Sequence, residues 1–388
     1  MARLAVIIFG LLLAPAALAT PVEKDWTILV FLNGHNNLDD FGTKNINQME
    51  QLGSNEHVNF VVQWASLQAS TVKRVLVQKD TDMNRVTSPV VQDIGQVDMG
   101  DPKVLKEFLL WGMQNYPAKH YLVDVWNHGS GWHFVEDLRS IHTDNISYDD
   151  ITGNSISTPQ LGAVMQEVAH VLGRPIDIYG SDACLMAMGE IAGEMEGAVD
   201  WFVGSEELEP GDGWPYHKAF APLMTNPGMT PRALSENLTV EYINNYVTTG
   251  EAVTFSVFDM SKYPMYRDAV TDLSREIQGL NSRSLKTVMT AIQSSQAFDS
   301  RDYVDFGDFV DKLMTKGVVP QSVMQAKAAV GQFVTMSRAS GRQRANGVSI
   351  WLPQDTRTYT DQRSKYNELK FNEETHWLDA ISSYVNNQ

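Results

Sequence analysis

The sequence predicts an α/β fold with a doubly wound, mostly parallel sheet flanked by helices and a helical C-terminal extension. Two observations predict it. Short apolar runs such as Trp26–Leu32 (WTILVFL), typical of strands buried on both faces, alternate with amphipathic helical stretches. Polar, glycine-rich segments follow several of these runs, and loops that follow parallel strands meet at one edge of a sheet. We therefore expect a functional crevice at that edge.

The chain opens with the pattern of a secretory signal peptide. Arg3 precedes the apolar run Leu4–Leu13, and Ala17, Leu18 and Ala19 form an A-x-A cleavage pattern. The run is too short to span a membrane comfortably. We predict a signal peptide over residues 1–19, cleavage near Ala19 and export to a periplasm or out of the cell.

The amino-acid composition limits the kinds of partner that the protein can bind. A formal net charge of −17 disfavours nucleic acid and anionic membranes but suits basic peptides. The single cysteine cannot form an internal disulfide, so the 43% of hydrophobic residues must supply the stability. We expect a monomer with no membrane span in the mature chain, a core over residues 20–250 and an α-rich part over residues 251–388 packed on it.

The elements follow in order. The strand Trp26–Leu32 should be central, and the next two strands are close enough to pair as a hairpin. Asp101 and Pro102 form an N-cap and first-turn pair before a helix. Strands are expected at 26–32, 58–64, 72–78, 120–126, 176–179, 201–204, 252–258 and 347–352, and helices at 38–52, 104–116, 158–172, 230–246, 261–278, 283–297, 303–316 and 319–339. Residues 133–157 show little periodicity and are predicted to form a long exposed loop.

Two segments carry candidate chemistry. In Pro175–Gly189 (PIDIYGSDACLMAMG) a strand leads into Cys184, which we place on the first turn of a helix, where the helix dipole lowers a thiol pKa. In Asn127–Trp132 (NHGSGW) His128 follows another strand and is placed for proton transfer. The plainer alternatives are a buried free cysteine and a loop histidine among turn glycines.

The sequence resembles the clostripain family of cysteine peptidases, in the caspase-like clan. The matching segments are LNGHNNLDD, WNHGSGW, ISYDD, YGSDACLMAMGEIA and VGSEELEPGDGWPY, which stand in the family's order between Trp26 and Tyr216. GVSIWLP near the C-terminus is a weaker match. The resemblance implies a caspase-like fold and hydrolysis of peptide bonds, with no cofactor required for the chemistry.

The resemblance also implies roles for single residues. Cys184 would be the nucleophile and His128 the general acid and base. Backbone N–H groups of Gly129 and Cys184 are candidates for the oxyanion hole. Asp182 matches an acid in the pocket for the residue before the cut, where it would select Arg or Lys, and Ser205 matches a small hydroxyl position at that pocket. A helix-cap role for Asp182 is the alternative.

Three further features remain open. Glu206, Glu207, Glu209 and Asp212 form an acidic loop that favours basic substrates, binds calcium or, as is commoner, is a solvated face. Trp214 either walls the pocket or packs in the core. Self-processing, which the family suggests, would cut after Arg139, before Ser140, because Pro175 blocks a cut after Arg174; otherwise the chain works uncut.

The resulting interpretation is an exported cysteine endopeptidase acting on peptides or proteins with Arg or Lys before the cut. Two other classes stay open. One is a catalytically silent, peptidase-like binding protein, and the other is an acyl transferase or ligase that uses the same Cys and His. The sequence contains no HExxH motif, P-loop or GxGxxG after a strand, which disfavours metal and nucleotide chemistry.

Overall fold

A nine-stranded sheet organises the molecule in the computed structural model, which describes residues 22–133 and 145–387. Its strand order is β12-β10-β9-β8-β5-β1-β2-β3-β4. Neighbours among β9, β8, β5, β1 and β2 run parallel, and the outer strands on both sides run antiparallel to their inner neighbours. The strands are β1 (Lys24–Gly34), β2 (Val58–Ser66), β3 (Lys73–Leu76), β4 (Val90–Asp93), β5 (Ala118–Trp126), β8 (Ile176–Asp182), β9 (Val199–Gly204), β10 (Val253–Asp259) and β12 (Val334–Ser340).

Helices cover both faces of the sheet because alternate residues of each central strand point to opposite sides. In β1, Leu29 and Phe31 belong to one apolar cluster, whereas Ile28 and Val30 belong to the other, and all four are fully buried. The first cluster includes residues of α2 (Pro102–Asn115), α3 (Thr158–Leu172) and α4 (Gly189–Glu194). The second includes residues of α1 (Asp39–Glu50), α5 (Tyr216–Ala219), α6 (Ala221–Thr225) and α7 (Pro231–Tyr246). The apolar run of β1 therefore reflects burial on two faces.

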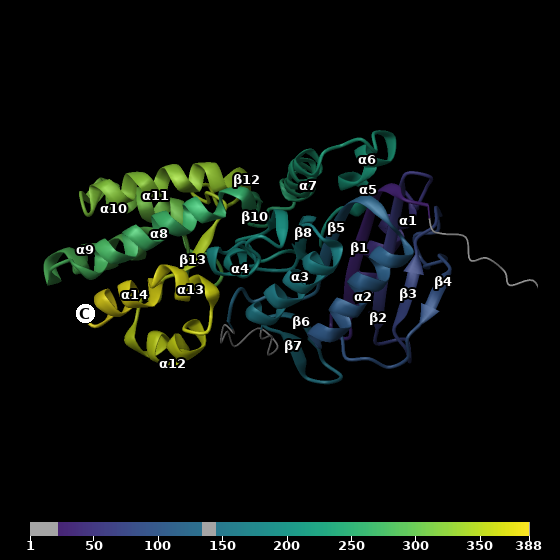
Figure 1. Cartoon of the computed structure of the whole chain (residues 1–388), viewed down its shortest axis with the longest axis horizontal. Coiled ribbons are helices and arrows are strands. Elements are labelled where there is room, and N and C mark those ends of the chain that lie inside the picture. Colours follow the sequence, from purple (N-terminus) through teal and green to yellow (C-terminus); the bar gives the residue numbers. More distant parts are fainter. Residues whose placement is uncertain (1–21, 134–144, 388) are drawn as a thin grey trace, which may run out of the picture.

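The C-terminal helices gather at the β12 end of the sheet, away from β4 (Figure 1). They are η1 (Met260–Lys262), α8 (Tyr263–Gln278), α9 (Ser282–Ser294), α10 (Phe306–Lys316), α11 (Pro320–Phe333), α12 (Thr356–Tyr366), α13 (Lys370–Thr375) and α14 (Trp377–Val385). The short strands β11 (Tyr303–Asp305) and β13 (Ser349–Trp351) pair with each other. Ser349 also forms a bridge with Met188, so this part contacts the segment that follows β8.

Most predicted elements are confirmed, including the central strand, the hairpin of β2 and β3, and the capped helices α2 and α3. The Asp101 side chain accepts a hydrogen bond from the backbone N–H of Lys103, and Ser157 forms a capping box with Gln160. No helix among the described residues is long and apolar enough to cross a membrane.

Four local predictions are wrong. Residues 303–305, expected to begin a helix, form the strand β11, and α10 begins only at Phe306. Residues 334–339, expected to continue a helix, belong to the edge strand β12, because α11 ends at Phe333 and the chain then pairs with β10. The expected exposed loop contains the hairpin of β6 (Ile146–Asp149) and β7 (Asn154–Ile156), where Ser147 and Asp149 are fully buried. Cys184 is not on a helix, since α4 begins only at Gly189.

Candidate active site

A cavity of about 300 Å³ lies at the carboxyl ends of β5 and β8, at the edge where the sequence predicts a crevice. Cys184, His128 and Asp182 all line it, together with residues from the loops after β1 and β9. The other lining residues are Leu38, Trp126, Asn127, Ala183, Leu208, Glu209, Pro210, Gly211 and Gly213. Three of the predicted site residues thus share one cavity.

Cys184 stands in a tight turn rather than on a helix. The next residue, Leu185, has a φ of +65°, and the turn continues to the start of α4 at Gly189. The predicted lowering of the thiol pKa by a helix dipole is therefore wrong. Burial instead raises the pKa of Cys184 to about 11, although the backbone N–H of Glu209, 3.2 Å from Sγ, lowers it in part. The Cys184 side chain is therefore an uncharged thiol at neutral pH.

A residue of the loop after β1 holds His128 in place. Its Nε2 donates a hydrogen bond to Oδ1 of Asn37 at 2.7 Å. Burial lowers the pKa of His128 to about 4, so the ring is neutral at neutral pH. With Nε2 engaged by Asn37, Nδ1 is the ring nitrogen that can accept a proton. Sequence reasoning missed Asn37, although it lies in the LNGHNNLDD segment.

Asp182 is buried in a polar network at the floor of the cavity. Its Oδ2 accepts hydrogen bonds from the Trp214 backbone N–H at 3.0 Å and the Tyr216 hydroxyl at 2.8 Å. That hydroxyl also lies 2.6 Å from Oδ2 of Asp124, a fully buried carboxylate under the site that the sequence did not reveal. Burial raises the pKa of Asp182 to about 6.

Glu209 brings a second carboxyl group against Asp182. Both of its carboxyl oxygens are buried without a hydrogen-bond partner among the described residues, and the Asp182 carboxyl group is close enough to repel its charge. Burial and the neighbouring Asp182 raise the pKa of Glu209 well above its usual value. The negative charges of two neighbouring carboxyl groups repel each other, so this pair favours having one member protonated.

The other predicted site residues fall into two groups. Gly129 packs directly on the turn of Cys184, since a Cβ at Gly129 would lie 2.5 Å from the Cys184 carbonyl oxygen. The two backbone segments named for the oxyanion hole therefore lie together. Ser205 is fully buried outside the cavity lining, and its Oγ lies 3.1 Å from Oγ1 of Thr254 and 2.9 Å from the Glu207 carbonyl oxygen. The structure does not bring Ser205 to the cavity.

The acidic loop is not the solvated face that such runs usually form. Glu206 and Glu207 are buried, and Glu207 forms an ion pair with Arg342 at 2.5 Å. Asp212 alone fits the solvated face, since its ion pair with Lys44 at 2.6 Å is about half exposed. Across residues 22–133 and 145–387, no cluster of three or more His, Cys, Asp or Glu side chains is arranged to hold a metal ion.

Trp214 belongs to the core. It is fully buried with its ring against Phe255, and only its backbone N–H reaches Asp182. The proposed processing site, Arg139 and Ser140, and the predicted signal-peptide cleavage at Ala19 lie outside the described residues.

Comparison with known proteins decides the family. The model of the clostripain family matches residues 30–384. The chain belongs to the clostripain family of cysteine peptidases. Clostripain of Hathewaya histolytica is 29% identical to it over 133 residues, which is 32% of this chain and 24% of that protein. The chain thus matches about a quarter of the length of that curated relative.

Solved structures confirm the caspase-like fold that the family resemblance predicts. An inactive zymogen C11 protease from Parabacteroides distasonis has a TM-score of 0.72 at 17% identity, over 92% of this chain and 99% of that one. A secreted C11 cysteine protease from Bacteroides thetaiotaomicron, in complex with an irreversible peptide inhibitor, has a TM-score of 0.70 at 20% identity, over 91% and 99%. These clostripain-family structures share nearly the whole architecture.

Proposed function

We propose that the chain is an exported cysteine endopeptidase that hydrolyses peptide bonds after Arg or Lys. The observation that carries the proposal is the shared cavity, in which a thiol, an imidazole and a buried carboxyl pair meet at the end of the central strands. Membership of a cysteine peptidase family supports the chemistry. Export rests on the signal-peptide pattern of residues 1–19.

In the proposed mechanism Sγ of Cys184 attacks the carbonyl carbon of the substrate, and its proton passes to Nδ1 of His128. The oxyanion forms near the backbone N–H groups of Gly129 and Cys184, where fixed donors are worth several kcal/mol, about 10²–10³ in rate. His128 then gives its proton to the departing amine as the C–N bond breaks. Water, deprotonated by His128, hydrolyses the thioester and restores the thiol.

The proposed selectivity rests on Asp182 and Glu209. A guanidinium or ammonium group in the cavity would compensate the negative charge of the two carboxyl groups, and it would pair with both. A neutral side chain there would leave buried carboxyl groups without a compensating charge. Glu209 is thus the second residue that we assign to this pocket, beside the acid that the sequence indicated.

The proposal includes self-cleavage after Arg139. The cut would fall between the segments that carry His128 and Cys184, in the stretch that precedes Asn145. It requires the same activity toward a basic residue, so it depends on the peptidase function. No cofactor is needed for the steps above.

Hydrolysis of fluorogenic Arg and Lys amides by wild type and by Cys184→Ala tests the function. We expect turnover with wild type alone, while equal turnover by both proteins would overturn the proposed peptidase function.

Asp182→Asn should lower kcat/KM for Arg substrates about 10²-fold, because a charge-assisted hydrogen bond is lost in a buried site. A circular-dichroism melt checks that this buried variant folds. Product analysis with added amines separates hydrolysis from acyl transfer, and activity of wild type excludes a silent binding protein.

A further inference from the structure

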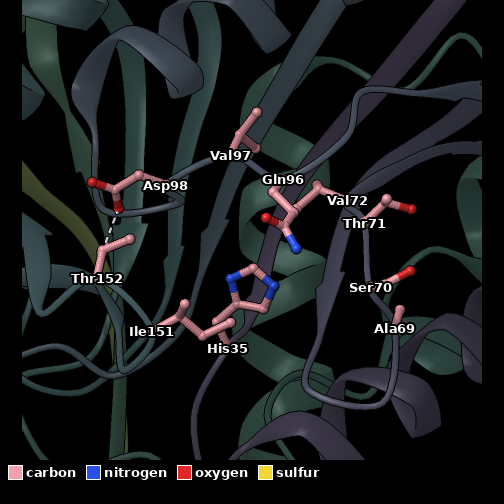
Figure 2. A pocket seen from close by; sticks show the side chains of 10 residues that line it. All are labelled: His35, Ala69, Ser70, Thr71, Val72, Gln96, Val97, Asp98, Ile151 and Thr152. Carbon is pink, nitrogen blue, oxygen red and sulfur yellow. Dashed lines mark hydrogen bonds between the residues drawn. The ribbon is translucent and has the colours of Figure 1, made fainter.

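A second cavity of about 310 Å³ lies beside the active site, on the far side of the loop after β1. Four segments build it: this loop, the β2–β3 turn, the stretch between β4 and α2, and the β6–β7 turn. Its lining residues are His35, Ala69, Ser70, Thr71, Val72, Gln96, Val97, Asp98, Ile151 and Thr152 (Figure 2). No step of the proposed mechanism uses them.

His35 is the most deeply buried polar group of this cavity. Its Nδ1 lies 2.8 Å from Oδ2 of Asp149, and its side chain is only 7% exposed. Asp149 is fixed in turn by the backbone N–H groups of Met99 and Ile151. Nε2 of His35 has no hydrogen-bond partner among the described residues, and the ring stands between the two walls of the cavity in Figure 2. With Nδ1 directed at Asp149, Nε2 is the ring nitrogen that faces a ligand in this cavity.

The charge of the cavity favours a cation. Asp98 accepts hydrogen bonds from the Gly100 backbone N–H, the Thr152 hydroxyl and the Asn154 amide, all of them neutral donors. The lining contains no Lys or Arg to offset this carboxylate. Val97 and the exposed Ile151 supply apolar surface, which suits the aliphatic stem of a long basic side chain.

The second cavity lies on the side of Cys184 where the part of the substrate after the cut would leave. His128 protonates the departing amine in the proposed mechanism, so the chain after the cut leaves on the His128 side of Cys184. On that side the loop after β1 contributes Asn37 to His128 and, two residues earlier, His35 to the second cavity. The Cα atoms of His35 and Asn37 are at most about 7 Å apart.

The order of the strands gives the distance from Cys184 to the second cavity, and this distance tells which substrate residue can reach the cavity. Cys184 follows β8, His128 follows β5, and the cavity lies where β1 and β2 end, with these four strands adjacent in the sheet. At about 4.8 Å per strand, the gap between β1 and β2 is about 12 Å from β8. An extended peptide rises about 3.3 Å per residue, so about the third or fourth residue after the cut reaches this gap.

We propose that this second cavity binds a Lys or Arg side chain located about three residues after the cleaved bond. The inference rests on the proposed peptidase function and extends it, since the enzyme would then recognise two basic residues, one on each side of the cut. Selection at the second position would act on long peptides and would have no effect on substrates that end at the scissile amide.

The test uses internally quenched peptides with Arg before the cut and either Lys or Gln at the second, third or fourth position after it. We expect wild type to prefer Lys at one of these positions by about 3- to 10-fold in kcat/KM, the effect of one partly exposed ion pair. Gln96→Lys should abolish the preference, and Gln96→Glu should increase it. Gln96 is exposed, so both variants should fold.

Gln321→Lys, which makes the same change on the exposed surface of α11, is the matched control and should keep the preference. All variants should cleave a short Arg coumarin amide at the wild-type rate. Two results would overturn the inference, provided that the enzyme cleaves the short amide. One is equal cleavage of the Lys and Gln peptides at all three positions, and the other is an unchanged preference for Lys in Gln96→Lys. Loss of that activity in wild type would instead reject the peptidase function.

Discussion

The backbone N–H of Glu209 lies 3.2 Å from Sγ of Cys184, so the loop after β9 contacts the proposed nucleophile directly. The same residue places its carboxyl group against Asp182. The loop after β9 therefore contacts both Sγ of Cys184 and Asp182, the acid that we assign to substrate selection. Any movement of this loop would change the reactivity of the thiol and the charge of the pocket together.

The first prediction concerns the reactivity of Cys184 in the resting enzyme. Because burial raises its pKa to about 11, the rate of alkylation by iodoacetamide should rise about tenfold per pH unit from pH 7 to 10. Cys184 is the single cysteine of the chain, so labelling measured by intact mass reports on this thiol alone. A rate that levels off between pH 6 and 8 would contradict the prediction, and Cys184→Ala should take up no label.

The sequence predicted the sheet well because its signals are local and repeated. The run Trp26–Leu32 is apolar throughout since both faces of β1 are covered, and the cap before α2 is visible as Asp101 and Pro102. Cys184, His128 and Asp182 could be named from motifs that follow strands. Their shared edge then follows from the parallel order of β5 and β8.

The parts that failed depend on contacts between distant segments. Cys184 precedes a stretch with helical periodicity, yet Leu185 adopts a positive φ and Met188 pairs with Ser349 across the fold. Glu206 resembles an exposed acid, but its Oε2 accepts the backbone N–H of Gly347 in the interior. Asn37 offered no signal of its own, because its bond to His128 exists only once β1 and β5 are adjacent.

The second prediction assigns Asn37 as a positioning residue for His128. Asn37→Ala should lower kcat about tenfold with little change in KM, because the imidazole loses the bond that fixes its orientation and tautomer. Asn37→Asp should keep the orientation and raise the pKa of His128, which shifts the acidic limb of the kcat profile to higher pH. Asn386→Ala, an exposed asparagine at the end of α14, is the control. A change confined to KM would contradict the assignment.

The third prediction concerns stability and Glu190. This side chain is fully buried in α4, where its Oε1 accepts hydrogen bonds from the Trp351 backbone N–H and the Tyr366 hydroxyl. Burial raises its pKa from 4.5 to about 7. The folded state therefore holds the proton more tightly than the unfolded state. The associated stability is complete below about pH 4.5 and is lost as pH rises through about 7.

Glu190→Gln should remove this dependence, because the amide keeps the acceptor and carries no charge. Above pH 8 the variant should be more stable than wild type, by on the order of 1–3 kcal/mol. Urea unfolding of both proteins at pH 5.5 and pH 8.5 measures the difference. Glu373→Gln, on the exposed part of α13, should leave the pH dependence unchanged. Equal loss of stability with pH in wild type and Glu190→Gln would reject the role of this carboxyl group.

The last prediction tests self-processing after Arg139. Wild-type enzyme incubated after purification should yield two fragments that separate between Arg139 and Ser140, because a basic residue precedes this bond and no proline follows it. Arg139→Gln should stay intact, and Cys184→Ala should stay intact unless active wild type is added. The control variant Arg363→Gln, which changes an exposed arginine of α12, should be cut after Arg139 in the same way as wild type. Intact-mass measurement locates the cut, and an active sample that shows a single unbroken chain would mean that the enzyme works without processing.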